Sequence, residues 1–143
     1  MSEENKALIR RAVEDVWNGN DPDAIEELVA RDFVIHTSST SNDIHGREGA
    51  RQYFAGIYEA FPDIRFEIAD QIAEGDRVVT RWIARGTHQG AFQGIPPTGK
   101  PIRIEGLDID CVAGGKVVEC WTNVDELGLL RQIDAMPQPE TVG

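Results

Sequence analysis

The feature that most constrains the fold of this chain is a change of hydrophobic period at Pro62. Upstream of it, apolar residues recur every three or four positions, which is the spacing of one face of a helix. Downstream, Ile64, Phe66 and Ile68 alternate with other residues, which is the spacing of a half-buried strand. Helices followed by a run of strands favour an α+β fold, with the helices on one face of an antiparallel sheet.

Three helices and one short strand are predicted before Pro62. The apolar face of the first helix consists of Ile9, Ala12, Val13, Val16 and Trp17. The second helix begins at Asp21-Pro22, because proline fits the first turn of a helix. A short strand is expected at residues 33–37 and a polar loop at residues 38–46. The third helix is predicted at residues 47–61, where Pro62 ends it.

Four strands and a closing helix are predicted after Pro62. The strands are expected at residues 64–68, 77–87, 102–112 and 116–124. The segment Glu74-Gly75-Asp76 and the pair Gly114-Gly115 favour tight turns, so these strands should form an antiparallel meander. Apolar residues at helical spacing between residues 127 and 133 predict a short last helix.

The length and net charge of the chain limit the number of domains and the kinds of partner that it can have. A length of 143 residues fits one domain, which we place at residues 1–136, followed by a flexible tail at residues 137–143. The formal net charge of −11 argues against nucleic-acid or anionic-membrane partners, since both need Lys and Arg to neutralise phosphate. No apolar run reaches the roughly 20 residues that span a bilayer. Only two cysteines are present and no secretory signal is recognisable, so we expect a cytoplasmic protein.

Five short segments stand out together with Asp125. They are residues 60–63 (AFPD), 73–79 (AEGDRVV), 86–90 (GTHQG), 94–100 (GIPPTGK) and 115–121 (GKVVECW). These segments resemble the SnoaL-like polyketide cyclases, which belong to the nuclear-transport-factor-2-like (NTF2-like) fold. The resemblance extends from the first helix to Ile133. It is specific for the family but not for a reaction, because one fold hosts many activities.

The resemblance implies a cone, in which a curved, mainly antiparallel sheet and helices on its concave face enclose a pocket. It also implies that no cofactor is needed and that two cones pair through their outer sheet faces into a homodimer. The alternating apolar residues of the last two strands could supply that outer surface or could equally be core: Leu107, Ile109, Val118 and Cys120.

The resemblance further implies an acid/base aspartate on the last strand, and Asp125 stands at that position. The family's histidine on the preceding strand falls nearest to Cys111, so the chain departs from the pattern there. On the residues alone, Asp125 could instead cap the last helix. Asp108 is a second candidate acid/base residue, which could also face solvent.

The register of the last hairpin decides which of these side chains meet. If Gly114-Gly115 forms a two-residue turn, Val112 faces Val117 and Asp108 faces Trp121. Alternation would then place Asp108, Trp121, Asn123 and Asp125 on one face. A bulge would shift this pairing by one residue.

Histidines and aromatic residues supply the other candidates. His88, at the end of a long strand, could donate to a substrate carbonyl or could be a structural histidine. His36 is expected near the pocket mouth. No histidine has metal-ligand spacing with a second His or Cys, so no metal site is predicted. The remaining candidate substrate-binding residues could line a pocket for a small hydrophobic or aromatic ligand, or could be plain core: Trp17, Phe54, Tyr58, Trp82, Trp121 and Asn123.

The function predicted from these observations is cofactor-independent acid/base chemistry on a small hydrophobic carbonyl compound, by aldol cyclisation or isomerisation. Asp125 would remove a proton next to the carbonyl, and His88 or a water would stabilise the oxyanion. Two alternatives stay open. One is a non-catalytic ligand-binding domain, and the other is epoxide hydrolysis, with Asp108 and Asp125 flanking Arg103.

Overall fold

The computed structural model describes residues 2–136, so the tail predicted at residues 137–143 lies outside the described residues. The elements follow in this order: α1 (Ser2–Ala12), the π-helical segment η1 (Val13–Trp17), α2 (Pro22–Leu28), β1 (Val29–Thr37), β2 (Ile44–His45), α3 (Gly46–Ala60), β3 (Arg65–Glu74), β4 (Arg77–Thr87), β5 (Pro101–Ala113), β6 (Lys116–Val124) and α4 (Glu126–Gln132). This order confirms the predicted α+β class.

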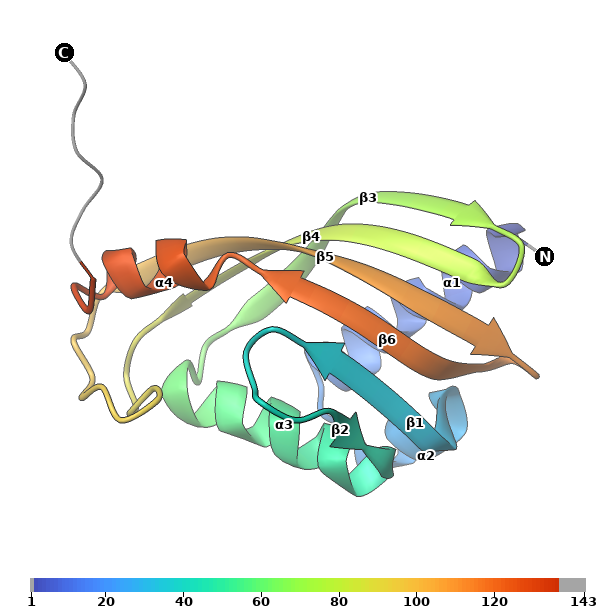
Figure 1. The fold of residues 1–143 in the computed structure, drawn as a ribbon, viewed down its shortest axis with the longest axis horizontal. Coiled ribbons are helices and arrows are strands. Elements are labelled where there is room, and N and C mark those ends of the chain that lie inside the picture. The colour runs from blue at the N-terminus through green and yellow to red at the C-terminus, as the bar shows by residue number, and fades with distance from the viewer. Residues whose placement is uncertain (1, 137–143) are drawn as a thin grey trace, which may run out of the picture.

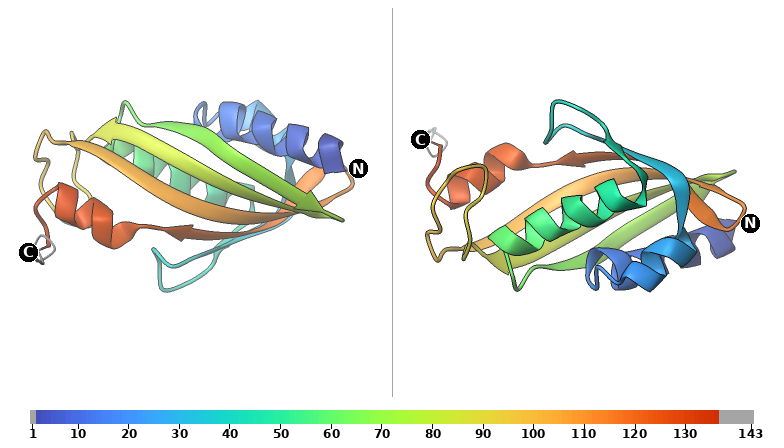
Figure 2. Two further views of the ribbon diagram at one scale, coloured as in Figure 1. Left: turned by 90° about the horizontal axis from the view of Figure 1, so that it is seen from above. Right: turned by 90° about the horizontal axis from the view of Figure 1, so that it is seen from below.

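The strands form one curved sheet in the order β2-β1-β6-β5-β4-β3. The strands from β3 to β6 make the predicted antiparallel meander, and β1 joins its edge parallel to β6. Figures 1 and 2 show α1, α2 and α3 on the concave side of the sheet, while α4 lies beyond the end of β6. The sheet and the three helices therefore enclose a space between them.

Local sequence signals explain the ends of the helices. The Asp21 carboxylate accepts a hydrogen bond from the backbone N–H of Asp23 at 3.0 Å, which caps α2 next to Pro22. Helix α3 ends before Pro62. The last turn of the first helix differs from the prediction, because residues 13–17 are π-helical. Such turns are rare and occur often at functional sites, and this one carries Trp17.

A β-bulge sets the register of β5 and β6. Val112 faces Val117 as predicted, but Cys111 pairs with Glu119, so Val118 is an extra residue in β6. Every later pairing moves by one position, and Asp108 faces Thr122 instead of Trp121. The prediction that Asp108 shares a face with Trp121, Asn123 and Asp125 is therefore wrong.

The meander also makes room for one large side chain. Trp82 on β4 pairs with Gly106 on β5, and its indole lies over the glycine. A Cβ atom added to Gly106 would come within 2.1 Å of the indole ring. Only a residue without a side chain therefore leaves Trp82 in this position.

We predict that Gly106→Ala destabilises the fold by about 1–3 kcal/mol, because either the indole or the strand must move. Chemical denaturation of the purified variant measures this free energy of unfolding. Gly56→Ala is the matched control: a Cβ on Gly56 in α3 meets no heavy atom within 4 Å. Since alanine is the better helix former, this control should be neutral or slightly stabilising. Equal stability of the two variants would contradict the prediction.

Candidate functional site

A cavity of about 310 Å³ lies between the concave face of the sheet and helices α1 and α3. Its walls are mostly apolar, and their aromatic members are Trp17, Phe33, Tyr53, Phe54, Phe61, Phe66, Trp82 and Phe92. The sheet side contributes a polar group of four residues, Asp108, Asp110, Cys120 and Thr122, which we call the polar floor. Within residues 2–136, no Lys, Arg or His side chain lines the cavity.

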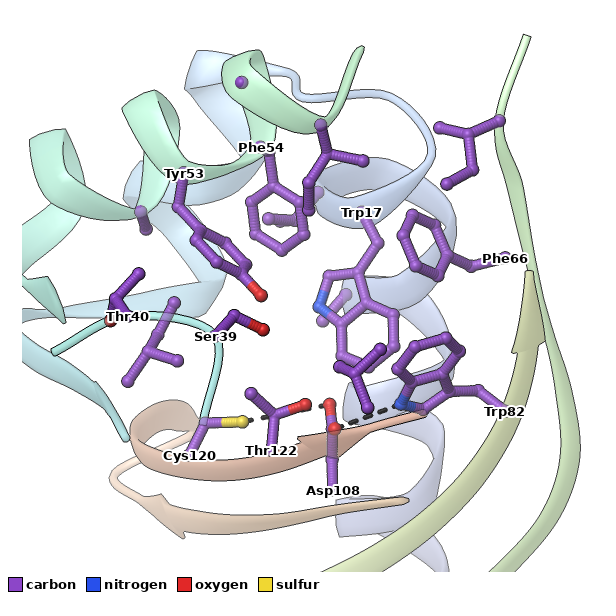
Figure 3. A pocket seen from close by; sticks show the side chains of 18 of the residues that line it. Trp17, Ser39, Thr40, Tyr53, Phe54, Phe66, Trp82, Asp108, Cys120 and Thr122 are labelled. Atoms are coloured by element: carbon purple, nitrogen blue, oxygen red, sulfur yellow. Dashed lines mark hydrogen bonds between the residues drawn. The ribbon is translucent and has the colours of Figure 1, made fainter. Parts of the chain in front are cut away.

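Asp108 is the best-connected member of the polar floor. Its side chain is only 3% exposed, and its Oδ1 accepts a hydrogen bond from Trp82 Nε1 at 3.0 Å. The Thr122 hydroxyl and the Cys120 thiol also donate to it, the thiol to Oδ2 at 3.8 Å (Figure 3). Burial raises the pKa of Asp108 to about 6, while these donors act in the opposite direction. The carboxyl group can therefore change its protonation state near neutral pH.

Asp110 lies two residues further along β5, and its side chain is 4% exposed. Burial raises the pKa of this carboxyl well above its usual value, and the nearby charge of Asp108 raises it further. Burial likewise raises the pKa of the Cys120 thiol, which therefore acts as a neutral donor. The polar floor thus holds two carboxyl groups and a thiol, all of them buried, at one wall of the cavity.

Tyr53 brings a hydroxyl group from the opposite side of the cavity. Its side chain points from α3 toward the polar floor (Figure 3). Burial raises the pKa of the Tyr53 phenol to about 12, while a hydrogen bond with Thr37 lowers it. The phenol is therefore neutral under ordinary conditions and can serve as a hydrogen-bond donor.

Comparison with protein families gives one match. The model of the SnoaL-like polyketide cyclases matches residues 7–133. This chain belongs to that family. No curated protein shows significant sequence similarity to it.

Several solved structures are similar to this SnoaL-like domain. A proposed SnoaL-like polyketide cyclase from Jannaschia sp. CCS1 is 26% identical, with a TM-score of 0.86 over 95% of each chain. IdmH, a proposed polyketide cyclase from Streptomyces antibioticus, is 34% identical, with a TM-score of 0.81 over 91% of this chain and 98% of IdmH. AclR, a proposed hydroxylase from Streptomyces galilaeus, is 30% identical, with a TM-score of 0.84 over 98% of this chain and 87% of AclR.

The predicted NTF2-like cone is confirmed as the fold class. A structure from Catenulispora acidiphila described as having a ketosteroid isomerase-like fold gives a TM-score of 0.74 over 91% of this chain and 97% of that chain. At 18% identity this likeness shows the fold alone. None of the helices in the described part of the SnoaL-like domain has the length and apolar character needed to cross a membrane.

Four of the candidates taken from the sequence meet at the cavity of this SnoaL-like domain: Trp17, Phe54, Trp82 and Asp108 (Figure 3). Tyr58 does not line the cavity, because its hydroxyl group instead donates a hydrogen bond to the backbone carbonyl of Trp17. Tyr53 and Asp110 were missed. The alternation of β5 could have identified Asp110, since it shares a strand face with Asp108.

Asp125 lies outside the cavity. It follows β6 as the N-cap of α4, where its exposed carboxylate accepts a hydrogen bond from the backbone N–H of Gly128 at 2.9 Å. The bulge and the end of β6 at Val124 together separate it from the inner face. The expected inward placement of Asp125 is therefore wrong, and the structure shows the capping alternative.

His88 is fully buried but does not line the cavity. Its Nδ1 accepts a hydrogen bond from the backbone N–H of Thr98 at 3.2 Å and lies 3.0 Å from the Thr98 hydroxyl oxygen. The ring also packs against Phe61, with 5.6 Å between ring centroids. His88 therefore joins the end of β4 to the loop that leads to β5. This placement matches the structural role that the sequence left open for His88.

Three further candidates lie outside the cavity. Asn123 is exposed, and Trp121 stacks on His36 with 5.1 Å between ring centroids. His36 Nδ1 lies 3.0 Å from Asp43 Oδ2, and His36 Nε2 lies 2.6 Å from Glu119 Oε2. These two contacts tie the loop after β1 to β6. Ser39 and Thr40 in the same loop line the cavity.

The set proposed for epoxide hydrolysis is not assembled. Arg103 lies on the outer face of the sheet, where it forms an ion pair with Glu105 at 3.8 Å. It therefore does not lie between Asp108 in the cavity and Asp125 at the helix cap.

We predict that the contribution of His36 to stability falls as pH rises. Hydrogen bonds to Glu119 and Asp43 raise its pKa above the ordinary 6.5. The stabilisation is therefore fully present below about pH 6 and is lost as pH rises through the raised pKa. Its size should not exceed about 1 kcal/mol, because the pair is partly exposed.

Denaturation of the wild type and of His36→Gln at several pH values measures this contribution. The difference between the two proteins should shrink toward alkaline pH. In an Asp43→Asn/Glu119→Gln background the same substitution should show no such trend. A difference that stays constant with pH in the wild-type background would contradict the prediction.

Proposed function

We propose that this SnoaL-like protein is a cofactor-independent acid/base catalyst that acts on a small hydrophobic carbonyl compound, with Asp108 as the base. The observation that carries the proposal is the buried Asp108 carboxylate, held by the Trp82 indole N–H against an aromatic cavity. A base near neutral pKa in a dry pocket is suited to removing a proton from carbon. Family membership supports a cyclase-type reaction.

In the proposed step, Asp108 takes a proton from the carbon next to the substrate carbonyl. The C–H bond breaks, an O–H bond forms on Asp108, and the electron pair passes to the carbonyl oxygen as an enolate. In an aldol cyclisation the enolate carbon attacks a second carbonyl of the same molecule, and Asp108 returns its proton to the new alkoxide. The protein is unchanged after one turnover, and neither an oxidant nor a reductant is required.

The character of the cavity supports an uncharged substrate. Its walls offer aromatic faces for a flat or unsaturated molecule. The described residues supply three carboxyl groups at the cavity, from Asp108, Asp110 and Glu126, but no cation, so a substrate anion would meet repulsion without compensation. The neutral hydroxyl of Tyr53 can hold a substrate oxygen on the side opposite Asp108.

We also propose a homodimer in the cytoplasm. The outer face of β5 exposes Leu107 by 51% and Ile109 by 37%, which supports pairing through that face. Both cysteines are free and buried, as suits a reducing compartment.

We predict that Asp108→Asn lowers turnover by about 10²–10⁴-fold, because an amide cannot accept the proton. The assay follows exchange of the carbon-bound proton of a small aromatic β-keto ester with D₂O by NMR, and thus requires no knowledge of the natural substrate. Asp125→Asn is the matched control, since it makes the same substitution at an exposed cap, where Asn serves equally well. This control should keep the wild-type rate.

The exchange assay distinguishes Asp108 from Asp125 as the base, and it distinguishes catalysis from ligand binding alone. Loss of exchange in Asp125→Asn with retention in Asp108→Asn would overturn the proposal. If the ester raises the melting temperature of the wild type but its proton does not exchange, the non-catalytic binding alternative is favoured.

We predict that the wild-type exchange rate rises with pH through the ionisation of Asp108, whose pKa is about 6. The base works only when it has lost its proton, so the rate should fall on the acidic side of that value. A rate profile from about pH 4 to pH 9 tests this expectation. A rate independent of pH across this range would count against Asp108.

A further inference from the structure

The polar floor contains a second carboxyl group that the proposed function does not use. Asp110 follows Asp108 on the same face of β5, so the two side chains enter the cavity side by side. One ligand-type atom from each of Asp108, Asp110 and Cys120 lies within 4.8 Å of the others. Two carboxylates this close in an apolar cavity repel each other strongly, so the pair retains one proton.

The hydrogen-bond partners show which carboxyl group keeps that proton. Asp108 is contacted by three donors, namely the Trp82 indole, the Thr122 hydroxyl and the Cys120 thiol. Within residues 2–136, the only side-chain hydrogen bond of Asp110 is with the Cys120 thiol, and its buried Oδ2 has no hydrogen-bond partner. Donors stabilise a carboxylate, whereas a buried carboxyl group with few donors is more stable when protonated.

We propose that Asp110 is a second catalytic residue, a neutral carboxylic acid that lines the cavity beside Asp108 and donates a proton to the substrate oxygen. The proposal rests on the proposed function of Asp108. The carbon that loses its proton and the carbonyl oxygen are only two bonds apart. The base and the acid that serve them must therefore lie as close together as these two carboxyl groups do.

The proton transfers balance over the cycle. Asp108 accepts the proton of the C–H bond while the Asp110 O–H bond breaks and its proton passes to the carbonyl oxygen, which gives an enol and an Asp110 carboxylate. When the enol carbon forms the new C–C bond, the enol proton returns to Asp110. Asp108 then gives its proton to the new alkoxide, and both carboxyl groups regain their starting states.

The first experiment observes the proton directly and does not depend on activity. Infrared difference spectroscopy of the full chain near pH 7 should show the C=O band of one protonated carboxyl group that is missing in Asp110→Asn. Asp125→Asn, at an exposed carboxylate, should leave this band in place. Asp108→Asn should also retain it, because Asp110 stays buried. A band that disappears only in Asp108→Asn would assign the proton to the other residue and overturn the proposal.

A divalent cation is the competing occupant of this group, since two carboxyl groups and a thiol could ligate one. Titration of the wild type with Zn²⁺ by calorimetry, together with elemental analysis of the purified protein, separates the two cases. Stoichiometric metal in the purified protein, or tight Zn²⁺ binding that removes the infrared band, would overturn the assignment of the proton to Asp110. Weak or no binding is expected.

The second experiment reads the role of Asp110 in turnover. The wild-type exchange rate should be bell-shaped in pH, because it needs Asp108 ionised and Asp110 protonated. Asp110→Asn keeps a donor but cannot transfer a proton, so its rate should fall roughly ten- to hundred-fold. Its profile should also lose the alkaline decline, while affinity for the ester stays unchanged.

An alkaline decline that persists in Asp110→Asn would overturn the role of Asp110 and leave Asp108 as the base. Full activity in Asp108→Asn would instead overturn the proposed function, whatever Asp110 does. Thermal unfolding of both variants checks that each has folded. Since an amide replaces a neutral acid of the same shape, Asp110→Asn should melt close to the wild type.

Discussion

The site depends on one extra residue, Val118, in the last strand. Without this bulge, the pairing that starts at Val112 and Val117 would turn Glu119 and Trp121 toward the cavity. The bulge reverses the faces. Cys120 and Thr122 now point inward and donate to Asp108, while Glu119 points outward and binds His36. A single inserted residue thus replaces a third buried carboxylate with two hydrogen-bond donors, and only then can the carboxyl groups of β5 be tolerated.

The same bulge marks the limit of what the sequence could predict. Periodicity identified the helices, the meander and the Gly114-Gly115 turn, because these follow from local patterns. A bulge leaves no such trace, since residues 116–121 alternate no more clearly in one register than in the other. The role of Asp125 was misjudged for a related reason: its motif position comes from the family, but whether its side chain turns inward depends on where β6 ends. Tyr53 directly precedes Phe54, which the sequence did identify as a candidate substrate-binding residue.

Charge is segregated in this molecule. The chain carries a net charge of −11, and several of its Arg side chains form ion pairs on the outside, such as Arg65 with Glu14 and Arg85 with Glu67. Among residues 2–136, carboxyl groups line the cavity and no Lys, Arg or His side chain does. In an enzyme that binds an anion, the opposite arrangement is expected. The electrostatics therefore favour an uncharged ligand. The hydrogen bonds of the polar floor are then the main interactions that can orient this ligand.

Family membership and shared fold do not determine the chemistry, because relatives of similar identity are described as a proposed polyketide cyclase and as a proposed hydroxylase. The polar floor is more informative, since burying two carboxyl groups lowers stability, and an apolar replacement would pack as well. The aromatic walls that would hold the substrate are also what removes water from Asp108 and raises its pKa. Binding and basicity thus have one physical cause. A ligand that fills the cavity displaces the remaining water and strengthens the base at the moment when it is needed.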